Sequence, residues 1–154
     1  MGAESRSRKN PRLEGFDYSR SGMYFITICT LGKEHILCRI FPAKLGSMEP
    51  KIEMLNPGVV AEEYVRKIPG IDRYVIMPNH IHLLIQNGKN RNISRIIQFF
   101  KANVTRKLGR SIFQDRFYDH IIRDEKDYLI KAKYIEDNPA KWADDDFYHR
   151  IPEV

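Results

Sequence analysis

Apolar residues recur along the chain in two patterns, which divide it into predicted strands and helices. Short runs rich in aromatic and β-branched residues are typical of strands, and apolar residues three and four apart are typical of one helix face. A segment at 35–41 is compatible with a short partner strand for the first one, whereas prolines and a glycine predict an irregular course over 42–57. The patterns predict strands at 23–30, 71–77, 80–86 and 112–122, and helices at 58–68, 93–108 and 124–138.

The order strand, helix, strand pair, helix, strand, helix predicts the α+β class. An antiparallel sheet with its helices packed on one face would bury these elements, as in ferredoxin-like and RRM-like folds. We expect one domain at 22–142, flanked by a basic arm at 1–21 and a tail at 143–154. No apolar run approaches the length of a membrane span, and the first residues lack a signal-peptide core. We therefore expect a cytoplasmic protein without a membrane partner.

Charge changes this picture by favouring a polyanionic partner. The chain has a formal net charge of +6 and a sequence pI of about 9.3. Its two cysteines, Cys29 and Cys38, lack zinc spacing and are predicted to be small buried hydrophobes. Candidate phosphate contacts, for each of which a solvated helix face or loop is the alternative, are Lys101, Arg106, Lys107, Arg110, Arg116 and Arg123.

The segment His80-Ile81-His82 carries the strongest chemical signal. Side chains two apart on a strand point to the same face, so both imidazoles are expected to lie together. Burying two imidazoles is costly unless something binds them, and neutral imidazole is the commonest metal ligand. The pair therefore predicts a divalent metal site, with a satisfied core histidine as the alternative for either ring.

Two histidines underfill a metal site, so a further ligand must come from another element. Tyr134 and Asn138 are four apart and share one face of the last predicted helix. Asn138 offers a carboxamide oxygen to a hard cation such as Mg²⁺ or Mn²⁺, although asparagine before proline also commonly ends a helix. A phenol beside a metal-bound phosphate is a candidate nucleophile, and simple packing is the alternative for Tyr134. Tyr128 cannot share this face, because six residues turn a helix by about 240°.

Four stretches, which together span nearly the whole chain in order, carry a resemblance to a known family. They are residues 11–18 with 24–30, 74–82, 113–124 and 134–139. In these stretches the chain resembles the IS200/IS605-type tyrosine transposases, the single-tyrosine branch of the HUH nucleases, and most of all their REP-associated tyrosine transposase-like group. Phe16 and Phe113 replace the usual tyrosine and tryptophan, but both keep an aromatic ring.

The resemblance implies a site and an activity. His80 and His82 match the histidines of the HUH motif, Tyr134 matches the nucleophile, and Asn138 stands where the family places a third polar metal ligand. Such enzymes cut single-stranded DNA beside a hairpin, and the tyrosine becomes joined to the 5′ phosphate while a 3′ hydroxyl is released. The metal, Mg²⁺ or Mn²⁺, polarises the scissile phosphate. The arm that contains Arg12 is expected to contact bases that flank the hairpin.

The resemblance also leaves two alternatives. Mobile members resemble homodimers that share active sites, whereas domesticated members resemble monomers. A non-catalytic nucleic-acid-binding module with the same fold is the alternative to a transposase-type endonuclease and strand transferase, because fold does not fix function. Intact His80, His82 and Tyr134 favour the enzyme, since a binding module does not need all three.

Overall fold

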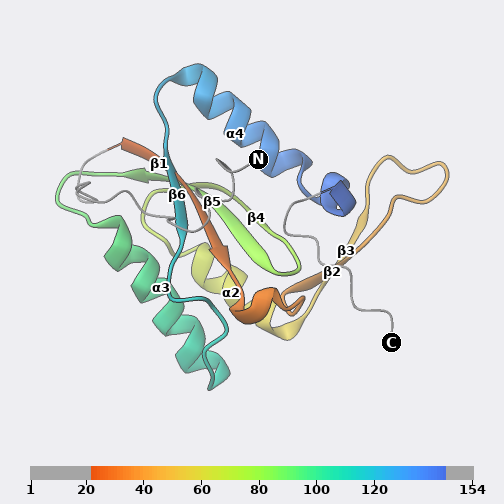
Figure 1. Ribbon diagram of the computed structural model, residues 1–154, viewed down its shortest axis with the longest axis horizontal. Helices are drawn as coiled ribbons and strands as arrows, with labels where there is room; N and C mark the ends of the chain where they lie inside the picture. Colours follow the sequence, from red (N-terminus) through yellow and green to blue (C-terminus); the bar gives the residue numbers. More distant parts are fainter. Residues whose placement is uncertain (1–21, 145–154) are drawn as a thin grey trace.

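A four-stranded antiparallel sheet forms the centre of the computed structural model, which describes residues 22–144 (Figure 1). The strand order is β4-β5-β1-β6, with every neighbouring pair antiparallel. One helix connects β1 to β4 and another connects β5 to β6, which are the two split β-α-β units of a ferredoxin-like plan. The predicted α+β class is confirmed. The bounds are β1 Gly22–Cys29, α2 Asn56–Val65, β4 Ile71–Ile76, β5 His80–Asn87, α3 Ile93–Leu108 and β6 Tyr118–Ile121.

The main hydrophobic core lies between the sheet and the helices α2 and α3. In β5 every second side chain, at Ile81, Leu83 and Ile85, is fully buried in this core. Their cross-strand partners in β1 are Tyr24, Ile26 and Ile28, and α3 contributes the apolar residues along one of its faces. Gly109 caps the end of α3 in a left-handed conformation, with φ 79°, and donates its N–H to the carbonyl of Thr105.

The last helix, α4 (Glu125–Asp137), covers the opposite face of the sheet, as Figure 1 shows. The prediction that the helices share one face is therefore wrong for α4. Phe25 and Leu84, which alternate with the core residues of β1 and β5, pack instead against Ala132 and Ile135 of α4. The physical reason is that β1 and β5 are apolar at consecutive positions, which requires cover on both faces.

A separate two-stranded hairpin replaces the predicted partner strand. β2 (Cys38–Phe41) pairs with β3 (Lys51–Met54) rather than with β1, so the prediction of an irregular course over 42–57 is also wrong in part. Both edges of β1 are already occupied by β5 and β6, so no free edge remains for β2. The short 3-10 turn η1 (Leu31–Lys33) redirects the chain instead.

Smaller differences concern the ends of elements. The predicted strand 112–122 is shortened to β6, although Phe113 makes one isolated bridge to Thr30. Both cysteines are buried and free, as predicted. Among the described residues, none of the helices is long and apolar enough to cross a membrane.

Candidate active site

His80 and His82 project from the α4 face of β5, side by side. Their ring centroids lie 4.6 Å apart, with the ring planes at 72°. The two residues are 0% and 2% exposed, so both imidazoles are buried. They alternate with the core residues of the same strand, as the period of two predicts. The pairing of β1 with β5 sets Thr27 opposite His82 and Cys29 opposite His80.

Each imidazole is held through its Nδ1 atom. Nδ1 of His82 lies 2.8 Å from the hydroxyl of Thr27, and Nδ1 of His80 lies 2.8 Å from Oδ1 of Asn79. The amide nitrogen of Asn79 donates to the carbonyl of Lys33, so its oxygen is the atom that faces His80. Because that oxygen only accepts, Nδ1 of His80 carries the proton, and Nε2 is the nitrogen with a lone pair for a cation.

Both histidines are neutral near pH 7. Burial lowers the pKa of His82 to about 3. Burial also lowers the pKa of His80 well below its usual value. The neighbouring His82 lowers the pKa further, and the Asn138 side chain opposes this effect. Neutral imidazole is the form that binds metals, so protons do not compete for the site at neutral pH.

The helix α4 carries Tyr134 and Asn138 to this pair. The ring centroids of Tyr134 and His82 lie 5.1 Å apart at 64°, and Phe25 stacks on His82 while its edge meets Tyr134. Tyr134 is 42% exposed, whereas Asn138 is buried. The sequence predicts that both residues share one helix face, and the structure places that face over the histidines of the same chain.

The donor set fits a hard divalent cation. Oδ1 of Asn138 is buried and has no hydrogen-bond partner among the described residues, although the Asn138 side chain is near enough to influence the pKa of His80. A buried carbonyl oxygen without a hydrogen bond destabilises the fold, and a bound cation would satisfy that oxygen. No cluster of three or more histidine, cysteine or acidic residues suited to a metal occurs within residues 22–144. A cation here would therefore rest on two imidazoles and the Asn138 carboxamide.

Three residues around the pair have no role in the sequence prediction. Thr27 and Asn79 hold the imidazoles, and a buried strand threonine or a turn asparagine gives no distinctive sequence signal. Trp142, in the 3-10 segment η2 (Pro139–Asp144), is buried, with its ring centroid 6.0 Å from His80 and 5.4 Å from His35. Trp142 covers the histidine site, where it packs with Cys29 and Met77.

Tyr128 lies apart from Tyr134, as the helix geometry predicts. Its hydroxyl donates to Asp72 at 2.5 Å and accepts from Arg73 at 3.3 Å, on the edge strand β4. Nε2 of His120 lies 2.8 Å from a carboxylate oxygen of Asp127 in the first turn of α4, so His120 contacts the start of that helix. Neither residue is part of the histidine site.

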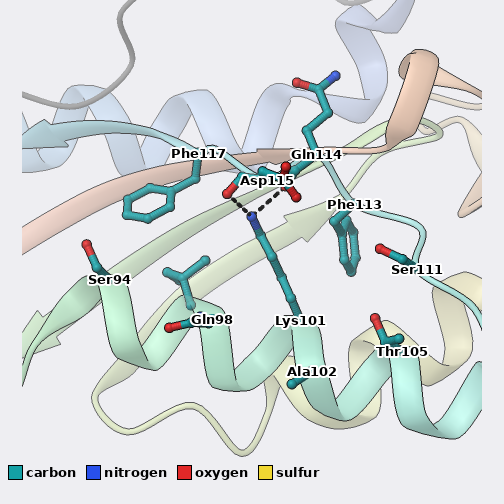
Figure 2. Close-up of a pocket in the computed structure, with 11 residues that line it drawn as sticks. Ser94, Gln98, Lys101, Ala102, Thr105, Ser111, Phe113, Gln114, Asp115 and Phe117 are labelled. Carbon is teal, nitrogen blue, oxygen red and sulfur yellow. Dashed lines mark hydrogen bonds between the residues drawn. The ribbon is translucent and has the colours of Figure 1, made fainter.

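The predicted DNA contacts differ in their surroundings. Figure 2 shows Lys101 reaching across a cavity of about 470 Å³ between α3 and residues 111–117, where its ammonium donates to the carbonyls of Gln114 and Asp115 at 2.6 and 3.1 Å. Arg12 lies outside the described residues. The role of all these cations in DNA binding stays a prediction. Five of them are exposed, namely Arg106, which also donates to Asn103, and Lys107, Arg110, Arg116 and Arg123.

Comparison with known proteins identifies the family to which the chain is related. Residues 60–138, which include all four proposed site residues, match the family described as transposase IS200 like. The chain is 31% identical to an uncharacterized protein of Haemophilus influenzae, over 92% of this chain and 93% of the relative. It is 28% identical to a putative REP-associated tyrosine transposase of the same organism, over 81% and 74% of the two chains.

A further relative and a solved structure agree with this family assignment. A REP-associated tyrosine transposase of Escherichia coli K12 is 27% identical, over 80% of this chain and 70% of the relative. A solved structure of a REP-associated tyrosine transposase bound to a REP hairpin has a TM-score of 0.59 and 22% identity, over 85% of this chain and 73% of that one, which supports the fold. The chain belongs to the IS200-like transposase family and is similar within it to the REP-associated tyrosine transposases.

Proposed function

We propose that this protein is a metal-dependent, single-stranded DNA endonuclease and strand transferase in which Tyr134 is the nucleophile. One observation carries the proposal. The Tyr134 phenol is 42% exposed, and its ring centroid is 5.1 Å from that of His82, which is itself buried. A DNA strand can therefore reach the phenol from outside, while the metal ligands stay shielded from water. The hairpin bound to the structural relative supports a hairpin-bearing substrate for this chain.

The reaction is a transesterification. The Tyr134 oxygen attacks the phosphorus, and the bond from phosphorus to the 3′ oxygen breaks. The DNA becomes joined to Tyr134 through its 5′ phosphate, and the 3′ oxygen leaves as a hydroxyl that takes up a proton. An ordinary phenol has a pKa of about 10, so its proton must leave as the bond forms. Attack by a free 3′ hydroxyl on the phosphotyrosine reverses the step and rejoins strands.

The remaining residues bind and orient. Nε2 of His80, Nε2 of His82 and Oδ1 of Asn138 would hold Mg²⁺ or Mn²⁺. That ion supplies charge stabilisation to the scissile phosphate when it is bound. Thr27 and Asn79 hold the two imidazoles through Nδ1, which would leave Nε2 of each ring to bind the ion. All of these groups come from one chain, so a monomer is sufficient for the proposed chemistry.

The test is formation of a covalent adduct that survives denaturation. The protein is incubated with single-stranded hairpin DNA from the flanks of its own gene and with Mn²⁺, then separated on a denaturing gel. We expect an adduct in wild type and in Tyr128→Phe, the matched tyrosine on the same helix. We expect none in Tyr134→Phe or in the presence of EDTA.

Two outcomes oppose the proposal in different ways. An adduct that persists in Tyr134→Phe overturns the choice of nucleophile. If wild type and Tyr134→Phe bind the hairpin equally and wild type forms no adduct, the chain acts as the non-catalytic binding module.

A further inference from the structure

A groove of about 690 Å³ lies beside the histidine site, between the β2–β3 hairpin and the segment η2. Its volume falls within the usual range for sites that bind small molecules, about 300–1,000 Å³. Trp142 belongs to both places, because it lines the groove and its ring centroid is 6.0 Å from that of His80. The Trp142 ring therefore separates the groove from His80 by a single side chain.

Both walls of the groove continue directly into the site. Pro78 lines the groove and lies two residues before His80 in the turn that leads into β5. Pro139 lines it from the other side and directly follows Asn138. The groove is thus lined by residues that stand next to two of the three proposed ligands in the sequence, although the ligands themselves do not line it.

The β2–β3 hairpin presents exposed apolar and aromatic surface to the groove. Phe41 is 43% exposed and Met48 is 93% exposed, although large apolar side chains are usually covered. Arg39 also lines the groove, and its guanidinium pairs with Glu53 at 3.1 Å. An exposed aromatic ring with a nearby cation is the combination on which bases of single-stranded nucleic acid stack.

We propose that this groove holds one unpaired nucleobase of the DNA strand, on the nucleotide next to the phosphate that Tyr134 attacks, with Phe41 as its stacking surface. The proposal rests on the proposed function. The formal net charge of +6 favours a polyanionic occupant, and continuity with the histidine site favours the substrate strand itself. Bases inside a duplex are already stacked on each other, so only an unpaired base has a free face for Phe41.

The test is a series of hairpin substrates, each with one abasic position among the unpaired nucleotides around the cleavage site. In wild type we expect one position next to the cleaved phosphate to slow adduct formation about tenfold, the effect of losing one stacked base. Phe41→Ala should slow the intact substrate by the same factor and show no further loss at that position. Phe41→Trp should restore the wild-type pattern.

A matched control is available on α3. Phe99 is 69% exposed and does not line the groove, so Phe99→Ala should keep the wild-type abasic pattern. Met48→Ala supplies a second groove variant whose exposed side chain carries little of the fold, and it should weaken the same abasic effect. If the full abasic effect persists in Phe41→Ala, the groove does not hold that base.

Binding distinguishes failure of this inference from failure of the proposed function. If wild type forms no adduct on any substrate, the equilibrium affinity of the abasic series for Tyr134→Phe gives the answer instead. A loss of affinity at one position, absent in the double variant Tyr134→Phe/Phe41→Ala, supports the groove without the chemistry. Equal affinity across the series overturns it.

Discussion

The two faces of the central sheet are built from alternate residues of the same strands and have opposite characters. Toward α2 and α3, β5 presents Ile81, Leu83 and Ile85, and this face is an apolar core. Toward α4 the same strand presents His80, His82 and Leu84, and two imidazoles are buried there beside a buried carboxamide. Burial without ligands disfavours these polar groups. We infer that the apolar α2–α3 face stabilises the fold, whereas the polar groups buried on the α4 face destabilise it and serve the chemistry.

The largest expected effects come from substituting two neighbouring residues of β5, one on each face of the sheet. His82→Gln should abolish Mn²⁺ binding in titration calorimetry, because it removes a ligand, and should leave the free energy of unfolding nearly unchanged. Leu83→Ala, one residue away, should lower the free energy of unfolding in urea by about 2–5 kcal/mol and keep Mn²⁺ affinity while folded. Unchanged Mn²⁺ affinity in His82→Gln would remove the histidines from the proposed metal site.

The next effect concerns the hydroxyl that holds His82. Thr27→Val keeps the shape of the side chain but removes its hydrogen bond to Nδ1 at 2.8 Å. Loss of such a supporting contact typically weakens metal affinity about 10–100-fold. Calorimetry with Mn²⁺ should show this loss, and Thr27→Ser should recover most of the affinity. If Thr27→Val binds as tightly as wild type, the hydroxyl does not orient the ring.

The pH dependence of the free energy of unfolding, measured in EDTA, shows how much the burial of His82 on the α4 face destabilises the protein. The folded-state pKa of His82 lies at about 3, below its ordinary value of 6.5, so the unfolded chain binds more protons between these values. The free energy of unfolding should therefore be highest above pH 6.5 and fall as the pH drops toward 3. His82 contributes about 1.4 kcal/mol per pH unit to this slope. The slope should be smaller by that amount in His82→Gln, and an equal slope in both proteins contradicts the burial argument.

The smallest expected effects concern two cations, one on α3 and one just after its end. If about five phosphates are neutralised, hairpin affinity should fall with salt at a log–log slope of about −3.5. Arg110→Ala should reduce that slope by about 0.7 and leave stability unchanged, since Arg110 is exposed. Lys101→Met should instead lower stability, because its ammonium joins α3 to the carbonyls of Gln114 and Asp115. Binding curves that are insensitive to Arg110 would remove it from the DNA contacts.

The sequence predicts the sheet and its order of elements well, because strand and helix periods are local properties of the chain. It does not predict which face α4 covers, since Phe25 and Leu84 are as apolar as their neighbours in the main core. The β3 strand, Lys51–Met54, is missed because it is short and largely exposed and so has little apolar alternation.

The same distinction applies to the site. His80 with His82, and Tyr134 with Asn138, are predictable because a strand repeats every two residues and a helix face recurs after four. Thr27 is not, because its contact with His82 depends on the register between β1 and β5. Trp142 is not either, because its place beside His80 depends on how η2 folds back after Pro139.

The central claim is that Tyr134, over the histidine pair of its own chain, forms the covalent bond to DNA. The most direct measurement is mass spectrometry of the trypsin-digested adduct. Cleavage after Lys133 and Lys141 gives the peptide 134–141, which contains Tyr134 as its only tyrosine, and Tyr128 falls in the separate peptide 127–131. We predict a phosphonucleotide on the peptide 134–141. The same modification on the peptide 127–131, or on any other tyrosine, would contradict the claim.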